Sequence, residues 1–378
     1  MDFLEKIAIA KRYKWKTCIY GLGLIGSNFG DECISYFDMK ADYYCDRNVE
    51  VLNKFDVAAD RKITIDKLKD FETDILIFVF VSENKYSDIY SVFEENSFLH
   101  IITWNDMQKS EYIICRYLQL DMLPKEMAKK KRRKKQIIID EHKIEKDKRI
   151  AVFTCITGGY DKLTKPLVIE KKCDYFLITD VQEDVKIEND EYYTRIPVSN
   201  VVPKILKTPK AKNRYCKMHG FEIFKDYDYS VYIDGSLQIV GRMEELVNKV
   251  GKYGIAFHRF PYGEDVYAHA MNLVFASRIK KEDACYEMQR LSKDGFPQNY
   301  GFPACGVVIC EHNIEIGKRV LCEWCDYYNN SLAKRDQLYI AYILWKNGIA
   351  ADEVCTLPGY SKNNGYFIMV SMHTGFQE

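Results

Sequence analysis

The sequence has no net charge and no long hydrophobic run. Its 55 basic residues balance its 55 acidic residues, which argues against a general nucleic-acid binder, because such proteins carry an excess of positive charge. The longest apolar run, Ile75 to Val81, is far too short to cross a bilayer. The first residues show neither the apolar core nor the small-residue cleavage site of a secretory leader. We therefore expect a cytoplasmic protein that binds no nucleic acid.

The 13 cysteines show no disulfide framework, because their number is odd and they are scattered along the chain. For a cytoplasmic protein we expect free thiols. Cys322 and Cys325 form a lone CxxC motif, and a zinc site that includes the upstream Cys305 and Cys310 is one interpretation. The first pair lies in helix-like sequence and the second in strand-like sequence. We therefore favour buried free cysteines.

The chain of 378 residues is long enough for two domains. Residues 1–123 alternate strand-like and helix-like segments, and the strand-like runs lie at 17–20, 43–45, 75–81 and 98–103. This alternation is typical of consecutive βαβ units, which form a parallel sheet. The sequence predicts an α/β fold with a Rossmann-like N-terminal domain.

Three glycines, Gly21, Gly23 and Gly26, form a GxGxxG motif between the first strand and the first helix of this domain, and Asp46 follows 20 residues later. In the dinucleotide-binding fingerprint, such glycines let a phosphate approach a helix N-terminus, and the acid binds a ribose. Two interpretations stay open: a nucleotide bound by this domain, or glycines that only let helix and sheet pack closely. An NAD(P)-dependent oxidoreductase is the alternative function, although residues 1–123 contain no persuasive hydride-transfer set.

Residues 124–148 interrupt this pattern with seven consecutive cations, Lys129 to Lys135. Like charges at this density favour a solvated segment, so we predict a basic linker. Peripheral contact with the anionic inner face of a membrane is a second interpretation, because each cation near the surface contributes about 1 kcal/mol. Nucleic-acid binding is disfavoured, because no aromatic residues or recognition motif accompany the run.

Three strand-like runs of the C-terminal part are each followed at once by a polar residue: Thr157, Asp180 and Asp234. If the strands are parallel neighbours, these residues line one edge of the sheet, where open α/β sheets bind ligands. Asp234 follows the apolar run YSVYI, and a carboxylate at this place can hold a divalent cation against phosphate oxygens. The alternative is that Asp234 only begins an Asp-Gly turn.

Residues 204–224 read as a basic helical segment. Most of its lysines suit a solvated helix face. Arg214 and Lys217 stand out, because they lie close before the Asp234 strand and could offset the charge of a diphosphate. We predict that these two residues contact a phosphorylated donor.

A set of motifs in the C-terminal part, TGGYD, FLITD, NRYCKMH, YSVYIDGS and RDQL with a late histidine, resembles a family of GT-A type glycosyltransferases that includes mucilage- and tapetum-associated plant proteins. The resemblance covers about residues 148–376. It implies a GT-A-like, nucleotide-diphospho-sugar transferase domain over residues 149–378. It also implies a UDP-sugar as the most expected donor, and Mn²⁺ or Mg²⁺ as the cation. Asp234 would be the principal metal ligand and His373 the remote one, while Ser236 occupies the place of a second acid.

The resemblance also implies roles at the RDQ motif. Arg335, Asp336 and Gln337 would face donor and acceptor: Asp336 would position sugar hydroxyls or act as a base, and Gln337 would neighbour the reacting carbon. The alternative for Asp336 is a helix cap before an amphipathic helix. His258 would contact acceptor or donor, or be structural, and Tyr160 belongs to the predicted donor loop.

The sequence thus predicts a two-domain α/β glycosyltransferase that moves a sugar from a nucleotide-sugar donor to a hydroxyl acceptor. The acceptor would be a saccharide or a lipid-linked molecule in the assembly of a surface polysaccharide or glycolipid. A non-catalytic nucleotide-binding scaffold is the remaining alternative.

Overall fold

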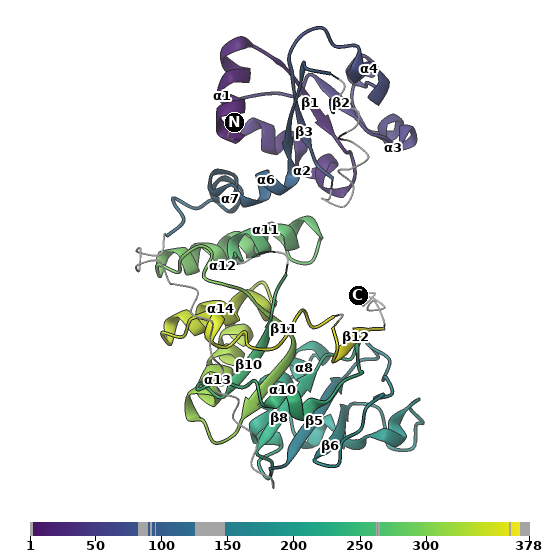
Figure 1. The fold of residues 1–378 in the computed structure, drawn as a ribbon, viewed down its shortest axis with the longest axis vertical. Helices are drawn as coiled ribbons and strands as arrows, with labels where there is room; N and C mark the ends of the chain where they lie inside the picture. The colour runs from purple at the N-terminus through teal and green to yellow at the C-terminus, as the bar shows by residue number, and fades with distance from the viewer. Residues whose placement is uncertain are drawn as a thin grey trace. The chain divides into compact units, whose positions relative to one another are not determined.

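A computed structural model gives the fold and describes residues 3–81, 90, 93–94, 96–124, 148–261, 263, 265–362 and 364–370. The contacts divide the chain into two units (Figure 1), one made of residues 1–123 with 267–294 and the other of residues 124–266 with 295–378. The basic run Lys129 to Lys135 and the predicted ligand His373 lie outside the described residues. The contact units differ from the predicted domains over Tyr267–Asp294, which the sequence assigned to the C-terminal domain.

The first unit is built on a four-stranded, fully parallel sheet with the order β2-β1-β3-β4. Every residue of the central strand β3 is buried, as expected for a parallel strand with both faces covered. The sheet is consistent with the predicted Rossmann-like domain. Its strands are β1 (Lys16–Tyr20), β2 (Tyr43–Cys45), β3 (Ile75–Val79) and β4 (Leu99–Thr103).

Two helices from late in the chain, α11 and α12, complete the first unit. The ring of Phe275 in α11 lies 4.7 Å from that of Phe29 and 4.9 Å from that of Tyr117, measured between centroids. Lys281 of α12 forms an ion pair with Glu32 at 2.6 Å. This aromatic packing explains why the segment joins the N-terminal residues. The described helices of the unit are α1 (Phe3–Tyr13), α2 (Leu24–Ser35), α3 (Val49–Lys54), η1 (Ala59–Arg61), α4 (Ile65–Lys69), α6 (Trp104–Lys109), α7 (Glu111–Leu118), α11 (Val266–Phe275) and α12 (Lys281–Lys293).

The GxGxxG motif shows how closely α2 approaches the loop after β1. Gly21 adopts a positive φ of 88°, which favours glycine. A Cβ added at Gly26 would lie 1.9 Å from the carbonyl oxygen of Gly21. The Asp46 carboxylate accepts hydrogen bonds from the backbone amides of Leu22 at 2.5 Å and Asn48 at 2.7 Å. These contacts support the packing interpretation, and nucleotide binding by this unit stays a prediction.

The second unit contains a six-stranded mixed sheet with the order β10-β11-β8-β5-β6-β7. Strands β5 to β8 pair in parallel, and β11 runs antiparallel to both of its neighbours. The arrangement is consistent with the predicted GT-A-like domain. The strands are β5 (Ile150–Ile156), β6 (Cys173–Thr179), β7 (Thr194–Pro197), β8 (Tyr229–Ile233), β10 (Ile255–Arg259) and β11 (Pro303–Glu311), and β9 (Leu237–Ile239) pairs separately with β12 (Phe367–Met369).

Side chains of β8 alternate between the two faces of this sheet. Val231 and Ile233 belong to a core formed with β9, β12 and α10. Tyr232 points to the other face, where its hydroxyl lies 3.3 Å from the side-chain nitrogen of Asn213 in α8. Asp234 continues this second face, because it accepts a hydrogen bond from the Tyr232 hydroxyl. The helices of the unit are α8 (Pro209–Met218), α9 (Gly220–Ile223), α10 (Met243–Val247), α13 (Glu315–Asn330) and α14 (Gln337–Lys346), with short helices η3 (Asp190–Tyr192), η4 (Val198–Asn200) and η5 (Ala351–Glu353).

The helix after the RDQ motif is not amphipathic, and that prediction was wrong. All seven residues from Leu338 to Leu344 are buried. The reason is that α14 packs against α13, β11 and η5, so that no face remains for solvent.

We expect Gly26→Ala to lower the free energy of unfolding of the first unit by about 2 kcal/mol, because the added methyl group collides with backbone that cannot move away. Gly23→Ala is the matched control, because a Cβ there meets nothing within 4 Å; we expect a loss of at most about 1 kcal/mol, because Gly23 is also the N-cap of α2. Urea unfolding followed by circular dichroism measures both. Equal effects of the two substitutions would contradict the packing interpretation.

Candidate functional site

The carboxyl ends of β5 and β8 form the switch point of the second sheet. The chain runs from β5 outward to β6 and β7, and then returns to place β8 on the other side of β5. Because these strands are parallel, Thr157, Asp180 and Asp234 follow strand ends at one edge of the sheet, as the sequence predicts. Ligands of open α/β sheets bind at such switch points.

Two of these residues shape the loop after β5. The Thr157 hydroxyl donates to the carbonyl oxygen of Pro209 at 2.9 Å. The backbone amide of Gly158 donates to the Asp180 carboxylate, with the shorter distance of 2.9 Å to Oδ2. Tyr160 lies half-buried in the same loop. Thr157 and Asp180 therefore hold this loop in place at the edge of the sheet.

The centre of the site is a buried cluster of two carboxylates and two cations. The Lys217 ammonium lies 2.9 Å from Asp336 Oδ2 and 3.7 Å from Asp234 Oδ1. The Arg214 guanidinium Nε lies 3.0 Å from the same Asp336 oxygen. The side chains of Lys217 and Asp336 are 2% and 9% exposed, whereas that of Asp234 is 30% exposed. The cluster therefore faces solvent mainly through Asp234.

Lys217 and Asp336 are both charged at neutral pH. Burial by itself would raise the pKa of Asp336, but the charges of Arg214 and Lys217 outweigh it and hold this pKa well below its usual range. Burial would lower the pKa of Lys217, but Asp234 and Asp336 raise it above its ordinary value. The Asp336 side chain makes no helix-capping hydrogen bond. These contacts argue against simple capping and give Asp336 a role in holding the two cations, whereas its predicted roles, positioning sugar hydroxyls or acting as a base, stay predictions.

Three residues that the sequence reading missed hold this cluster in place. The Tyr232 hydroxyl donates to Asp234 Oδ1 at 2.9 Å, and the Asn213 side-chain oxygen accepts a hydrogen bond from the Arg214 guanidinium. The indole nitrogen of Trp324 donates to the backbone oxygen of Asp336 at 2.8 Å. Tyr232 precedes Asp234 by two residues and hence shares its face, a signal that could have been found.

The other residues of the RDQ motif take different places. The Gln337 amide donates to the backbone oxygen of Pro303 at 3.1 Å. Arg335 is half-buried in the turn before α14, and its charge acts on Tyr328. Their predicted roles toward donor and acceptor stay predictions.

His258 lies fully buried in β10. Its Nδ1 lies 3.1 Å from the backbone oxygen of Pro358, which can only accept, so Nδ1 carries the hydrogen. Burial lowers the pKa of His258 to about 4. Among the described residues, no hydrogen bond or ion pair joins it to Asp234 or Asp336. These contacts support the structural interpretation of His258.

The predicted metal ligands are only partly described. Asp234 Oδ1 is engaged by Tyr232 and faces Lys217, so Oδ2, which lies beside Gly306, is the oxygen that a cation could take. Ser236 is buried in the turn between β8 and β9. Of the predicted ligands that the structure describes, Asp234 thus offers one carboxylate oxygen, which fits a cation that also takes ligands from phosphate oxygens.

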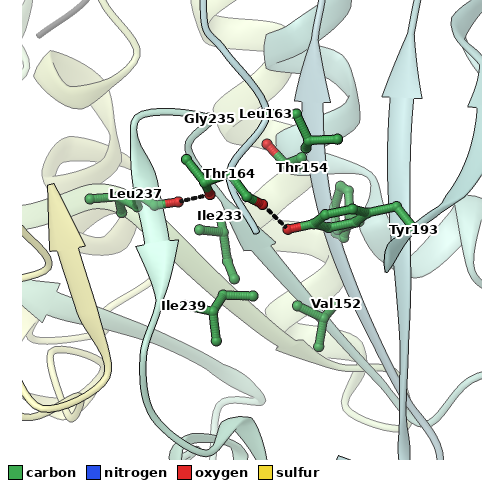
Figure 2. Close-up of a pocket in the computed structure, with 10 residues that line it drawn as sticks. Val152, Thr154, Leu163, Thr164, Tyr193, Ile233, Gly235, Leu237 and Ile239 are labelled. Atoms are coloured by element: carbon green, nitrogen blue, oxygen red, sulfur yellow. Dashed lines mark hydrogen bonds between the residues drawn. The ribbon is translucent and has the colours of Figure 1, made fainter. Parts of the chain in front are cut away.

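A small apolar pocket lies in the same unit but is not part of this site. Figure 2 shows the Tyr193 hydroxyl donating to the backbone oxygen of Thr164 at 2.9 Å, and the Thr164 hydroxyl donating to that of Leu237 at 3.1 Å. None of the four charged residues lines it, so we regard it as a packing gap beside the core. Its lining residues are Val152, Phe153, Thr154, Leu163, Thr164, Tyr193, Ile233, Gly235, Leu237 and Ile239.

We expect Asp336→Asn to lower the free energy of unfolding of the second unit by roughly 3–5 kcal/mol, because it leaves two buried cations without their shared carboxylate. The control Asp352→Asn removes an exposed partner of Arg259, with a side chain that is 53% exposed, and should cost less than about 1 kcal/mol. Denaturant titration of both variants measures the difference. Similar losses would show that the buried cluster is energetically unimportant.

The buried His258 predicts a specific loss of stability in acid. Its pKa is about 4 in the folded protein and about 6.5 in an unfolded chain. The unfolded chain thus takes up the proton first, so the contribution of His258 is complete above pH 6.5 and is lost as the pH falls toward 4. We expect His258→Asn to reduce the dependence of unfolding free energy on pH between 5 and 7 by about 1 kcal/mol per pH unit. An unchanged slope in urea titrations would contradict this assignment.

Comparisons with known proteins assign this chain to no family. No protein-family model and no curated protein matches the chain. Among solved structures, one match is an apo structure of the bifunctional glycosyltransferase WbbM, at 10% identity and a TM-score of 0.36, covering 89% of this chain and 59% of that one. This chain thus spans about three fifths of that protein. Another is mouse xyloside xylosyltransferase 1 in its apo form, at 9% identity and a TM-score of 0.25, covering 88% and 82% of the two chains. At such values neither match assigns an activity to this chain.

Proposed function

We propose that the second unit is a glycosyltransferase, which moves a sugar from a nucleotide-sugar donor to a hydroxyl group of an acceptor. The observation that carries this proposal is the cluster of Asp234, Lys217, Arg214 and Asp336 beside the switch point of a mixed α/β sheet. Two fixed cations beside a partly exposed carboxylate suit a donor that carries a diphosphate.

The chemistry depends on the charge that develops on the departing diphosphate. Arg214 and Lys217 lie on α8 and are held by the buried Asp336, so they do not need to reorganise when negative charge appears nearby. Cations that are fixed in advance in a water-poor site stabilise such charge far better than mobile ones. In this proposal Asp336 acts as a positioning residue for the two cations.

We propose that Asp234 also holds a divalent cation, Mn²⁺ or Mg²⁺, through Oδ2. The family resemblance implies Ser236 and His373 as further ligands and a UDP-sugar as the donor. Such a cation supplies positive charge to the phosphate oxygens when it is bound. Lys217 remains at the other oxygen of Asp234, 3.7 Å away.

For the acceptor, we propose a saccharide or a lipid-linked molecule of a surface polysaccharide or glycolipid. The run of cations from Lys129 to Lys135 supports a lipid-linked acceptor, because it would attract the protein to the anionic inner face of a membrane. None of the described helices combines the length and apolar composition that crossing a bilayer requires. We propose that this run lets the protein approach the acceptor from the cytoplasm as a peripheral enzyme.

The first test is a thermal-shift screen of UDP-, GDP-, CMP- and dTDP-sugars, with and without Mn²⁺. A donor present at about 100 times its dissociation constant should add roughly 2.7 kcal/mol to the stability of the folded state. The donor found in this way is then used to measure sugar transfer, or slow hydrolysis in the absence of acceptor. A panel that neither stabilises the protein nor is hydrolysed would refute the proposal.

We expect Asp234→Asn to lower kcat/KM for the donor by roughly 100-fold or more, because the carboxylate that would hold the cation against the diphosphate is lost. Asp174→Asn is the matched control, because Asp174 lies at the start of β6, at the opposite edge of the same sheet, and is half-exposed. Retained activity in Asp234→Asn would exclude this carboxylate from the reaction. Oxidation of an alcohol with formation of reduced nicotinamide would instead indicate an oxidoreductase.

A further inference from the structure

A second cluster of metal-ligating side chains lies outside the candidate site, where the end of α8 and the start of α9 approach α13. One imidazole nitrogen of His219, one carboxylate oxygen of Glu222 and the sulfur of Cys322 all lie within 4.8 Å of one another. His219 and Glu222 are three residues apart and so can turn toward the same side. Cys322 comes from the middle of α13, about a hundred residues later in the chain.

The imidazole is already held in an orientation that suits a ligand. His219 Nδ1 lies 3.1 Å from the backbone oxygen of Tyr215, which can only accept, so Nδ1 carries the hydrogen and Nε2 keeps its lone pair. The Tyr215 ring stacks on the imidazole with centroids 4.1 Å apart, and its hydroxyl donates to Glu222 Oε2 at 3.3 Å. Outer contacts of this kind orient histidine and carboxylate ligands in known metal sites.

The charge around the cluster is negative. Glu222 and Asp326 both act on the Cys322 thiol, and Asp326 lies one helical turn after it on α13. Among the described residues, no ion pair involves Glu222 or Asp326. A bound divalent cation would compensate this local excess of negative charge.

We propose that His219, Glu222 and Cys322 bind a zinc ion, with water as its fourth ligand. A nitrogen, a sulfur and an oxygen form the mixed donor set that zinc accepts, whereas Mn²⁺ and Mg²⁺ prefer oxygen alone. This set differs from the zinc site considered on sequence, because Cys305 and Cys310 instead donate to backbone oxygens at 3.7 Å. Cys325 lies buried on the same helix and accepts a contact from Asn329.

The position of the cluster suggests what the metal does. His219 follows Lys217 by two residues, and Cys322 precedes Trp324 by two residues. A zinc ion bound by these ligands would tie the end of α8 to α13, two positions along the chain from Lys217 and Trp324, which contact Asp336. The zinc ion would thereby help to hold the helices that carry the candidate site.

The experiment uses the full-length protein after dialysis against a chelator, followed by titration with Zn²⁺. We expect one equivalent of zinc per chain by elemental analysis. We also expect a rise of roughly 5–10 °C in the Tm of the second unit at zinc concentrations well above the dissociation constant. In the Co²⁺-loaded protein, thiolate-to-cobalt absorption in the near ultraviolet should report the Cys322 ligand.

Cys322→Ser should abolish this absorption, and Glu222→Gln, at an exposed position that does not endanger folding, should weaken zinc binding at least tenfold. Cys355→Ser, which also removes a half-buried thiol from the same unit, should retain both zinc and absorption. Asp234→Asn should retain them as well, so failure here is distinguishable from failure of the proposed transferase. Absence of stoichiometric zinc, or an absorption that survives Cys322→Ser, would overturn the proposal.

Discussion

The charge of one buried carboxylate sets the arrangement of the helical face in the second unit. Asp336 is nearly inaccessible, and a charge in such a place is tolerated only when it is paired. Its partners, Arg214 and Lys217, lie on α8, and Trp324 of α13 binds its backbone oxygen. Two helices, α8 and α13, are thereby fixed relative to one another by one residue at the start of a third helix, α14.

Buried ion pairs of this kind contribute little to stability, because the free-energy cost of removing the charges from water is about as large as their mutual attraction. Apolar residues of similar volume would fill the same space at lower cost. The retention of four charged side chains at the switch point of the sheet is therefore better explained by what they bind than by what they stabilise. This reasoning connects the ion pairs of the site with the proposed chemistry of a diphosphate.

Much of the sheet, but little of the site's geometry, could be predicted from the sequence. Short apolar runs with abrupt polar ends identified the strands and the edge at which Thr157 and Asp234 lie, because those signals are local. The contact between Lys217 and Asp336 joins residues 119 positions apart, and no local pattern encodes that pairing. The same limit explains the error over α14, whose complete burial depends on α13 and β11 rather than on its own periodicity.

The GxGxxG motif shows a different limit. A close approach of a phosphate and a close approach of a helix both require the absence of a Cβ, so the spacing alone cannot separate them. At Gly26 the neighbour that excludes a side chain is the backbone of Gly21. The spacing correctly predicts a tight turn between strand and helix. The cause of the tightness, the contact between Gly26 and the Gly21 backbone, depends on the three-dimensional structure.

Because α11 and α12 belong to the first unit, neither unit is a continuous stretch of chain. The first unit needs Phe275 and the residues around it to cover Phe29 and Tyr117, although Phe275 lies 246 positions after Phe29 and 158 after Tyr117. During synthesis on the ribosome, the N-terminal sheet must therefore wait, with part of its aromatic surface uncovered, until residue 294 has emerged. A gene fragment cut at the basic segment would divide this hydrophobic surface between two products, so neither half would carry a complete set of folding contacts.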